Sequence, residues 1–225
     1  MVVGEGRGRM AFERERDDMV SRQLEARGIR DARVLDAMRQ VPRHRFVTSE
    51  LAEHAHDDTP LPIGERQTIS QPYMVALMSE ALDLHGEAPR VLEVGTGSGY
   101  QAAVLATMGA SVLTIERIPA LASRARAVLA DLELDERVRV LDGDGTLGWP
   151  DEAPYDGIVI TAGAPQIPRP LLAQLALGGS LVLPMGEQDV QTLVRLRRGP
   201  QGLVEDYLGE CRFVKLRGAY GWSEP

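Results

Sequence analysis

Short apolar runs alternate with amphipathic stretches over most of the chain. Such an alternation predicts an α/β fold, in which a mostly parallel sheet is covered by helices on both faces. The predicted strands are Arg90–Val94, Val112–Glu116, Val138–Leu141, Tyr155–Thr161 and Ser180–Pro184, and the predicted helices between them are Gln101–Met108, Ala120–Leu132 and Pro170–Ala176.

The pattern changes near the C-terminal end, where two strand-like runs follow each other without a helix of normal length between them. These runs are Val190–Arg197 and Glu210–Leu216, and a turn rich in glycine and proline at 199–202 joins them. Strands joined by so short a connection pair in opposite directions. We therefore expect the sheet to close with an antiparallel C-terminal edge.

Helical patterns dominate the N-terminal part. We expect a disordered tip at 1–10, a helix from Ala11 to Gly28, a second helix capped by Asp31 and ended by Pro42, and a third over 72–84 with Pro72 in its first turn. The irregular stretch at 43–71 is long for a compact domain, which is typical of a functional loop. We predict one domain over 11–225, comprising a helical and substrate-loop region (11–84) and a cofactor-binding sheet with the C-terminal strands (85–225).

Charge and composition narrow the possible partners. The 225 residues carry a formal net charge of −8, which argues against nucleic-acid binding because phosphate contacts need a basic field. The exceptions, Arg7, Arg9, Arg14 and Arg16, interleave with acidic residues and indicate a solvated helix face. The single Cys211 excludes an intramolecular disulfide. No signal-peptide pattern and no apolar run near the ~18 residues of a membrane span is found, so we expect a cytoplasmic protein without a membrane partner.

The most informative motif is the turn Gly95-Thr96-Gly97-Ser98-Gly99 between a predicted strand and a predicted helix. Its glycines let the backbone approach a cofactor closely, and the helix N-terminus adds unpaired N–H donors. The third glycine comes one position too early for the G-x-G-x-x-G dinucleotide fingerprint. We therefore predict that this turn binds S-adenosylmethionine rather than NAD.

Acidic residues at the ends of the next strands are candidate adenosine ligands. Glu116 ends the strand beside the glycine turn, where a carboxylate can accept both ribose hydroxyls. Either Asp142 or Asp144, after the following strand, is placed to accept the adenine amino group. The alternative for these two residues is an ordinary Asp-Gly turn, which is a common structure.

The segment that ends the fourth strand, at 161–165, offers no carboxylate, lysine or amide that could deprotonate an acceptor. This absence suggests an acceptor that is already nucleophilic, and a carboxylate is ionised at neutral pH because its pKa is near about 4. The enzyme's task is then alignment by neutral donors, for which Gln67, Thr68 and Ser70 are candidates. For Ser70 the alternative is an N-cap of the helix at 72–84. We predict no metal site, since His54 and His56 lack a placed third ligand.

Four blocks together resemble the protein-L-isoaspartate (D-aspartate) O-methyltransferase family over roughly residues 14–222. They are PRHRFV at 42–47, PLPIG at 60–64 with QTISQPYMVA at 67–76, the glycine motif at 91–106, and YDGIVITAGAP at 155–165 followed by the glycine pair at 178–179. The glycine motif is shared by many methyltransferases, whereas the block at 67–76 is close to family-specific.

The resemblance implies a seven-stranded, Rossmann-like methyltransferase fold and methyl transfer from S-adenosylmethionine to the α-carboxyl of L-isoaspartyl residues, with D-aspartyl residues as a further substrate. The ester then closes to a succinimide without the enzyme, and hydrolysis returns some normal aspartate, which is repair of damaged protein. By the same resemblance the catalytic residue is Ser70, the substrate is bound by Gln67, Thr68 and Ile69, and the cofactor is bound by Glu93, Gly95, Thr96, Gly97, Ser98, Gly99, Glu116, Asp144 and Gly145.

One departure from the family pattern lies in this acceptor region. The family usually has glycine two residues after the glycine of the Pro-Ile-Gly sequence, and here that position holds Arg66. A cation at this point could attract a substrate carboxylate, point to solvent or alter loop closure.

Three alternative functions follow from the same residues. A carboxyl methyltransferase on this scaffold could esterify a normal aspartate of one dedicated partner peptide, but the ordinary length and the absence of an added recognition domain favour general repair of isoaspartyl proteins. We also expect a monomer. A silent adenosylmethionine-binding module would have no use for the block at 67–74. A nicotinamide-dependent oxidoreductase conflicts with the glycine spacing and with the lack of an evident proton donor at the strand ends.

Overall fold

A seven-stranded sheet forms the centre of the computed structural model, which describes residues 3–223 and side chains from residue 11 on. The strand order is β5-β4-β3-β6-β7-β8-β9. The first five strands in this order, from β5 to β7, run parallel, and β8 and β9 close the sheet antiparallel. This arrangement confirms the predicted α/β fold and its C-terminal edge. The strands are β3 (Arg90–Val94), β4 (Ser111–Glu116), β5 (Val138–Asp142), β6 (Tyr155–Ile160), β7 (Leu175–Gly186), β8 (Gln191–Gly199) and β9 (Gly202–Cys211).

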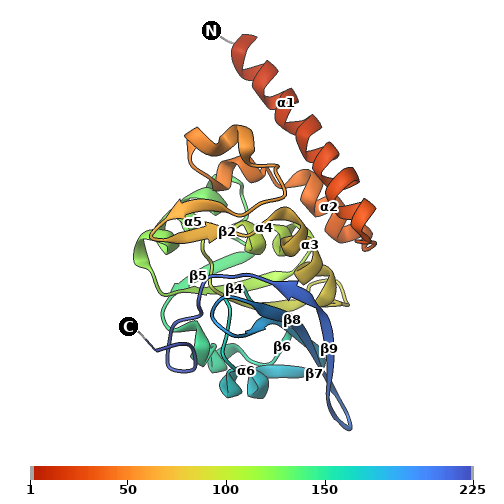
Figure 1. The fold of residues 1–225 in the computed structure, drawn as a ribbon, viewed down its shortest axis with the longest axis vertical. Helices are drawn as coiled ribbons and strands as arrows, with labels where there is room; N and C mark the ends of the chain where they lie inside the picture. Colours follow the sequence, from red (N-terminus) through yellow and green to blue (C-terminus); the bar gives the residue numbers. More distant parts are fainter. Residues whose placement is uncertain (1–2, 224–225) are drawn as a thin grey trace.

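Helices cover both faces of this sheet (Figure 1), with α2 to α5 on one side and α6 on the other. The helices are α1 (Val3–Met19), α2 (Ala32–Gln40), α3 (Pro72–Ala81), α4 (Tyr100–Thr107), α5 (Pro119–Asp131) and α6 (Arg169–Gln174), and the short helical turns are η1 (Val20–Leu24), η2 (Glu25–Arg27), η3 (Arg43–Phe46), η4 (Ser49–His54), η5 (Gly145–Leu147) and η6 (Pro150–Glu152). None of the helices in the described part is both long and apolar enough to span a bilayer.

The central strands alternate their side chains between two apolar cores. In β3, Val91 packs into the core under α2 to α5, whereas Leu92 and Val94 pack into the core that α6 covers. Both cores exclude water from strands with nearly continuous apolar sequence, as expected for a parallel sheet buried on both faces. Because these strands run parallel, their polar carboxyl ends lie at one edge of the sheet.

The N-terminal region follows the prediction at its turns and departs from it in its helices. Gly28 has the left-handed φ of 99° expected of a residue just past a helix, and Asp31 caps α2 by accepting from the Arg33 amide at 2.8 Å. The expected tip at 1–10 is helical from Val3 on, and its first two residues lie outside the described part.

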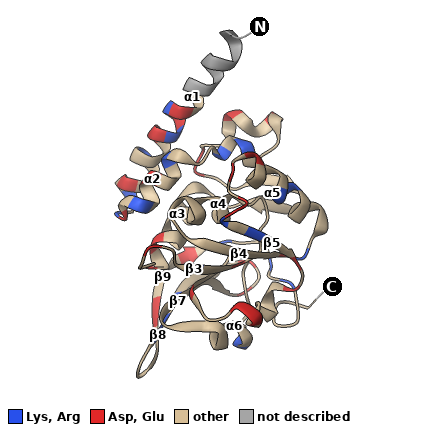
Figure 2. Cartoon of the chain, turned by 180° about the vertical axis from the view of Figure 1, so that it is seen from behind, with Lys and Arg blue, Asp and Glu red and all other residues tan. Residues whose placement is uncertain are grey.

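The charged face expected on α1 is only partly solvated. Arg16 is buried, and its Nε donates to the Arg39 carbonyl at 2.8 Å. Acidic and basic residues interleave along the coloured part of α1 (Figure 2). The side chains of Arg7 and Arg9 lie outside the described residues.

Two corrections concern the C-terminal half. The helix expected to reach residue 176 ends at Gln174, because β7 begins at Leu175 and pairs there with β6. The last strand was expected at 210–216, but β9 spans 202–211 and the chain then leaves the sheet. The reason is pairing: Cys211 faces Gln191, the first residue of β8, so the chain beyond it has no neighbouring strand.

The stretch expected to be irregular, 43–71, contains an antiparallel hairpin of β1 (Leu61–Gly64) and β2 (Gln67–Ile69). Its tip, Glu65 and Arg66, has φ of 52° and 58°. Two positive φ values are the geometry of a tight hairpin turn that favours glycine or asparagine. The unusual Arg66 therefore occupies a strained position of this turn.

Candidate active site

A pocket with about 840 Å³ of empty space, including its open mouth, lies at the carboxyl ends of β3, β4 and β6. This edge is where open parallel sheets bind ligands. Most of the predicted site residues line it together, from both the hairpin and the sheet: Gln67, Thr68, Ile69, Ser70, Glu93, Gly95, Thr96, Gly97, Ser98, Glu116 and Gly145. Two predicted residues, Gly99 and Asp144, do not line it.

The glycine turn is held tightly against its neighbours. Thr161, directly after β6, donates through Oγ1 to the Gly95 carbonyl at 2.5 Å. A Cβ on Gly95 would lie 2.6 Å from the same Thr161 Oγ1 atom. Gly95 also has a left-handed φ of 95°. A side chain there would clash with Thr161 and force the turn or β6 to shift.

Gly99 acts behind the turn rather than in the pocket. It precedes α4 with a φ of 88°, and a Cβ there would lie 3.3 Å from the Ala125 Cβ of α5. Its lack of a side chain thus allows α4 and α5 to pack closely.

The carboxylate of Glu116 supports the turn and faces the pocket. It accepts from the Gly97 amide at 2.8 Å and from the Ile118 amide at 2.9 Å, one bond to each oxygen. A carboxylate offers about four acceptor positions, so both oxygens can take a further bond. This geometry is compatible with the predicted contact to two ribose hydroxyls.

Glu93 is a buried acid without a partner. Its side chain is fully enclosed, and within the described residues neither carboxyl oxygen accepts or donates a hydrogen bond. Burial raises the pKa of Glu93 to about 8, which the nearby Thr114 hydroxyl opposes and the Glu116 charge reinforces. Unpaired buried polar groups are costly and mark places where a ligand atom can complete the bonding.

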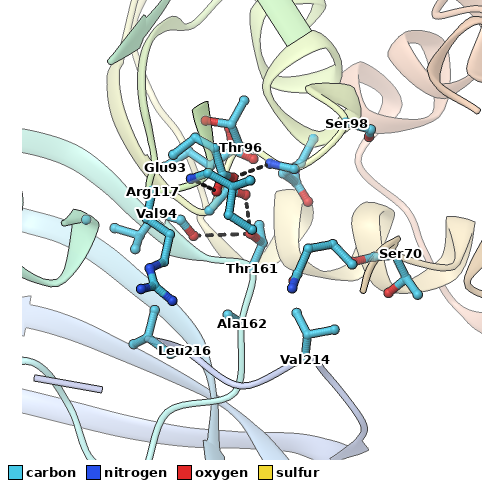
Figure 3. A pocket seen from close by; sticks show the side chains of 18 of the residues that line it. Ser70, Glu93, Val94, Thr96, Ser98, Arg117, Thr161, Ala162, Val214 and Leu216 are labelled. Atoms are coloured by element: carbon cyan, nitrogen blue, oxygen red, sulfur yellow. Dashed lines mark hydrogen bonds between the residues drawn. The ribbon is translucent and has the colours of Figure 1, made fainter. Parts of the chain in front are cut away.

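Figure 3 shows Ser70 across the pocket from Glu93. The N-cap of α3 is Gln71, and neither that residue nor Ser70 caps the helix with its side chain. In the described part of the chain, the Ser70 hydroxyl has no hydrogen-bond partner. The capping alternative is therefore not used, and the hydroxyl is available to a ligand.

Asp144 does not line the pocket, and both of its carboxyl oxygens accept hydrogen bonds within the protein. It caps η5 by accepting from the Thr146 amide at 2.9 Å, and its second oxygen accepts from the Ala219 amide at 2.7 Å. Partial burial would raise the pKa of Asp144, but the hydrogen bond from the Thr146 hydroxyl, together with the two amide bonds, outweighs it and lowers the pKa. Asp144 fixes the C-terminal segment, while Gly145 beside it lines the pocket. Asp142, the other candidate, is half exposed and pairs with Arg126.

The segment after β9 adds a wall that sequence reasoning missed. The Gly163 amide donates to the Val214 carbonyl at 2.7 Å, and the Leu216 amide returns a bond to the Gly163 carbonyl at 2.9 Å. These bonds place Val214, Lys215, Leu216 and Arg217 along the pocket, and Figure 3 shows Val214 and Leu216 there. Nothing in the sequence marks this segment, because its alternating pattern equally fits a strand.

Histidines and acids gather in no metal-binding group of three or more within residues 3–223. His54 pairs with Asp57 at 3.0 Å, and His56 pairs with Glu15 at 2.9 Å. Both histidines therefore have acidic neighbours outside the pocket.

Comparison with known proteins gives consistent results. A family model for protein-L-isoaspartate(D-aspartate) O-methyltransferase matches residues 14–220. The chain is 56% identical over 212 residues to protein-L-isoaspartate O-methyltransferase 1 of Syntrophobacter fumaroxidans, covering 94% of this chain and 98% of the relative. It is 54% identical over 215 residues to the protein-L-isoaspartate O-methyltransferase of Geobacter metallireducens, covering 95% and 99%.

Solved structures agree with these matches. A protein-L-isoaspartate O-methyltransferase structure superposes with a TM-score of 0.82 at 30% identity, covering 92% of this chain and 67% of that one. A structure from Plasmodium falciparum, described as a protein-L-isoaspartate O-methyltransferase in complex with S-adenosyl-L-homocysteine, gives a TM-score of 0.75 at 26% identity over 89% of this chain and 97% of its own.

Proposed function

The chain belongs to the protein-L-isoaspartate (D-aspartate) O-methyltransferase family, and on that basis we propose how its pocket divides the work of methyl transfer. The protein is an S-adenosylmethionine-dependent enzyme that methylates isoaspartyl residues in protein repair. The sheet side of the pocket is the cofactor half, and the β1–β2 hairpin is the acceptor half.

The cofactor half fits a nucleoside-bearing group. Gly95 leaves no room for a Cβ beside Thr161, so the turn offers bare backbone, and the buried Glu93 carboxyl has two unpartnered oxygens. Glu116 keeps acceptor positions for ribose hydroxyls. When bound, S-adenosylmethionine supplies a methyl group on a positively charged sulfur. We propose that its ligands are the predicted cofactor residues that line the pocket, namely Glu93, Gly95, Thr96, Gly97, Ser98, Glu116 and Gly145. Gly99 supports the turn from behind, and Asp144 acts through the backbone at Gly145.

The acceptor half holds a carboxylate. The isoaspartyl α-carboxylate is already ionised at neutral pH, so one of its oxygens would form the new bond to the methyl carbon without a base, while the bond from that carbon to sulfur breaks and S-adenosylhomocysteine leaves. We assign Ser70 the role of a neutral donor to the other oxygen, which fixes the carboxylate in line with the methyl group. Gln67, Thr68 and Ile69 border the substrate backbone. The observation that carries this assignment is that the Ser70 hydroxyl does not cap α3 and lies in the same pocket as the glycine turn.

The remaining features are proposed from the sequence. Isoaspartyl-containing proteins and peptides are the substrates, and we propose D-aspartyl residues as a further substrate. We also propose a cytoplasmic monomer without nucleic-acid or membrane partners, organised as one domain. The net charge of −8 supports the exclusion of nucleic acid.

Substitution of Ser70 tests the acceptor role. Ser70→Ala should lower kcat for an isoaspartyl peptide by about tenfold or more, because an unaligned carboxylate reaches the methyl group less often. The dissociation constant for S-adenosylhomocysteine, measured by calorimetry, should stay unchanged. Ser49→Ala, which removes an exposed hydroxyl bonded to Glu50, is the control and should match the wild type. An equal loss of cofactor affinity and turnover in Ser70→Ala would reject the assignment.

A further inference from the structure

Arg43 is the largest side chain that the fold encloses completely, and it comes from the PRHRFV block that the reaction itself does not explain. Its Nε donates to the Ala55 carbonyl at 2.7 Å, and its Nη2 donates to the Ser70 carbonyl at 2.7 Å. Nη1 has no partner among the described residues. A buried charge whose hydrogen bonds go only to two backbone carbonyls, with no carboxylate of the described residues paired to it, is expensive, which suggests that it serves a purpose other than stability.

The Ser70 carbonyl depends on this arginine for a partner. It lies just outside α3, whose first hydrogen bonds start from the Gln71 carbonyl, and Pro72 has no N–H to donate. The Tyr73 amide, which could close a turn onto the Ser70 carbonyl, donates instead to the Asp58 carboxylate at 3.2 Å. The turn that carries Ser70 is therefore braced from outside, by Arg43 at one end and by Asp58 at the other.

The same guanidinium also contacts the cofactor half of the pocket. Its central carbon lies 4.7 Å from the centre of the Tyr100 ring, and Tyr100 is the first residue of α4, directly after the glycine turn. Phe46, on the same helical turn as Arg43, packs edge-to-face with the Tyr100 ring, with 5.4 Å between the ring centroids. Arg43 thus lies between the two loops whose relative position determines the distance from acceptor to methyl group.

Charge and shape both suit arginine for this position. Burial lowers the pKa of Arg43 to about 10, an effect that Tyr100 partly offsets, so the group is still charged at neutral pH. A planar guanidinium can donate to two carbonyls while its face rests on an aromatic ring, whereas a lysine ammonium is a point charge that cannot meet the same three demands.

We propose that Arg43 is a positioning residue for methyl transfer: by holding the Ser70 carbonyl and the Tyr100 ring, it keeps the Ser70 hydroxyl aimed at the acceptor carboxylate. The proposal rests on the function proposed for Ser70. It predicts that Arg43 affects turnover through Ser70 rather than through cofactor binding.

A double-mutant cycle of Arg43→Lys and Ser70→Ala tests this link. Arg43→Lys alone should lower kcat by about ten- to a hundredfold, the scale of a small misplacement of a reacting group, and leave the affinity for S-adenosylhomocysteine within about twofold. In the Ser70→Ala background the same substitution should lower kcat by less than about threefold, since the hydroxyl that it misplaces is gone. An equal factor in both backgrounds would overturn the proposal.

Arg16→Lys is the matched control. Arg16 is likewise a buried arginine whose Nε donates to a distant backbone carbonyl, but that carbonyl belongs to Arg39, away from the pocket. It should lose stability to urea as Arg43→Lys does while keeping kcat within about twofold of the wild type. A comparable loss of kcat in Arg16→Lys would show that any weakened N-terminal packing slows the enzyme.

Hydrogen exchange gives a readout that does not depend on activity. Amides of the segment 67–71 should exchange faster in Arg43→Lys than in the wild type and remain unchanged in Arg16→Lys. Unchanged exchange at 67–71 in Arg43→Lys would overturn the proposal whatever the kinetics. If Ser70→Ala keeps full turnover, the role of Ser70 fails, and the exchange result still decides whether Arg43 braces the turn. Arg43→Gln, which is neutral and keeps one donor group, replaces the lysine variant if that variant does not fold.

Discussion

Glu116 holds the glycine turn and also faces the pocket, and one substitution removes both interactions together. A matched control can still separate this loss from a general change in charge. Its carboxylate fixes the Gly97 amide at 2.8 Å and faces the pocket. Glu116→Ala should weaken the binding of S-adenosylhomocysteine by about 1–3 kcal/mol, the scale of a lost charged hydrogen bond, measured by calorimetry.

The matched control for Glu116 is Asp142→Ala. Asp142 is the register partner of Glu116 on β5, but its carboxylate is half exposed and pairs with Arg126. Its removal should leave cofactor affinity unchanged. If both variants lost affinity equally, the effect would come from the charge of the strand ends and Glu116 would not be a specific ligand.

Glu93 makes stability depend on pH in a direction that can be derived. Its folded pKa of about 8 lies above its ordinary value of 4.5, so between these values the folded protein keeps a proton that the unfolded chain releases. Stability from this group therefore falls as the pH rises from 4.5 to 8. Glu93→Gln removes that fall, and its free energy of unfolding in urea, relative to the wild type, should rise over this range when no cofactor is present.

His44 and His56 also make stability depend on pH between about 4 and 6.5, but their contribution is the same in the wild type and in Glu93→Gln. Burial lowers the pKa of His44 and of His56 to about 4, so their contribution is lost as the pH falls from 6.5 towards 4 in both proteins alike. Parallel stability curves for wild type and Glu93→Gln would contradict the buried, protonated state of Glu93.

At the scale of elements, the β1–β2 hairpin carries a local cost. Arg66 has a φ of 58°, where a residue with a Cβ is less stable by about 1–2 kcal/mol than in the ordinary region. Because glycine also loses more entropy on folding, Arg66→Gly should raise the free energy of unfolding by about 0.5–1 kcal/mol. Urea unfolding monitors this gain.

Arg66→Ala separates the backbone effect from the loss of the side chain. It removes the guanidinium but keeps the Cβ, so it should not be more stable than the wild type. A similar gain in Arg66→Ala and Arg66→Gly would mean that the arginine side chain, and not the backbone of the turn, is unfavourable.

Elements could be predicted from the sequence where local pattern decides them. The parallel strands have continuous apolar runs, and the structure places β3 and β6 within a residue of the predicted ranges. The end of β9 could not be predicted, because the pattern to Leu216 fits a strand and only the position of Gln191, the start of β8, ends the pairing at Cys211. The hairpin at 61–69 was likewise hidden, since its tip lacks the usual glycine or asparagine.

At the scale of the molecule, the pocket combines segments that differ in how predictable they are. The cofactor half follows from strand ends next to each other in a βαβ unit, which the sequence reveals directly. The wall at 214–217 and the brace at Arg43 depend on contacts between distant parts of the chain, such as Gly163 with Val214 and Arg43 with Ser70. Side-chain contacts at the site were only partly predictable. Ser70 does not cap α3, which leaves its hydroxyl for the predicted role, whereas Asp144 accepts a hydrogen bond from the Ala219 amide of the C-terminal segment.

The most direct measurement of the central claim uses two peptides that differ only in one L-isoaspartyl or one normal aspartyl residue. Each is incubated with the protein and S-adenosylmethionine, and methyl ester and succinimide are followed by mass spectrometry. We predict methyl ester on the isoaspartyl peptide alone, followed by its succinimide. Methylation of neither peptide would contradict general repair and favour a dedicated partner peptide, and methylation of the aspartyl peptide would contradict the proposed selectivity of the acceptor half.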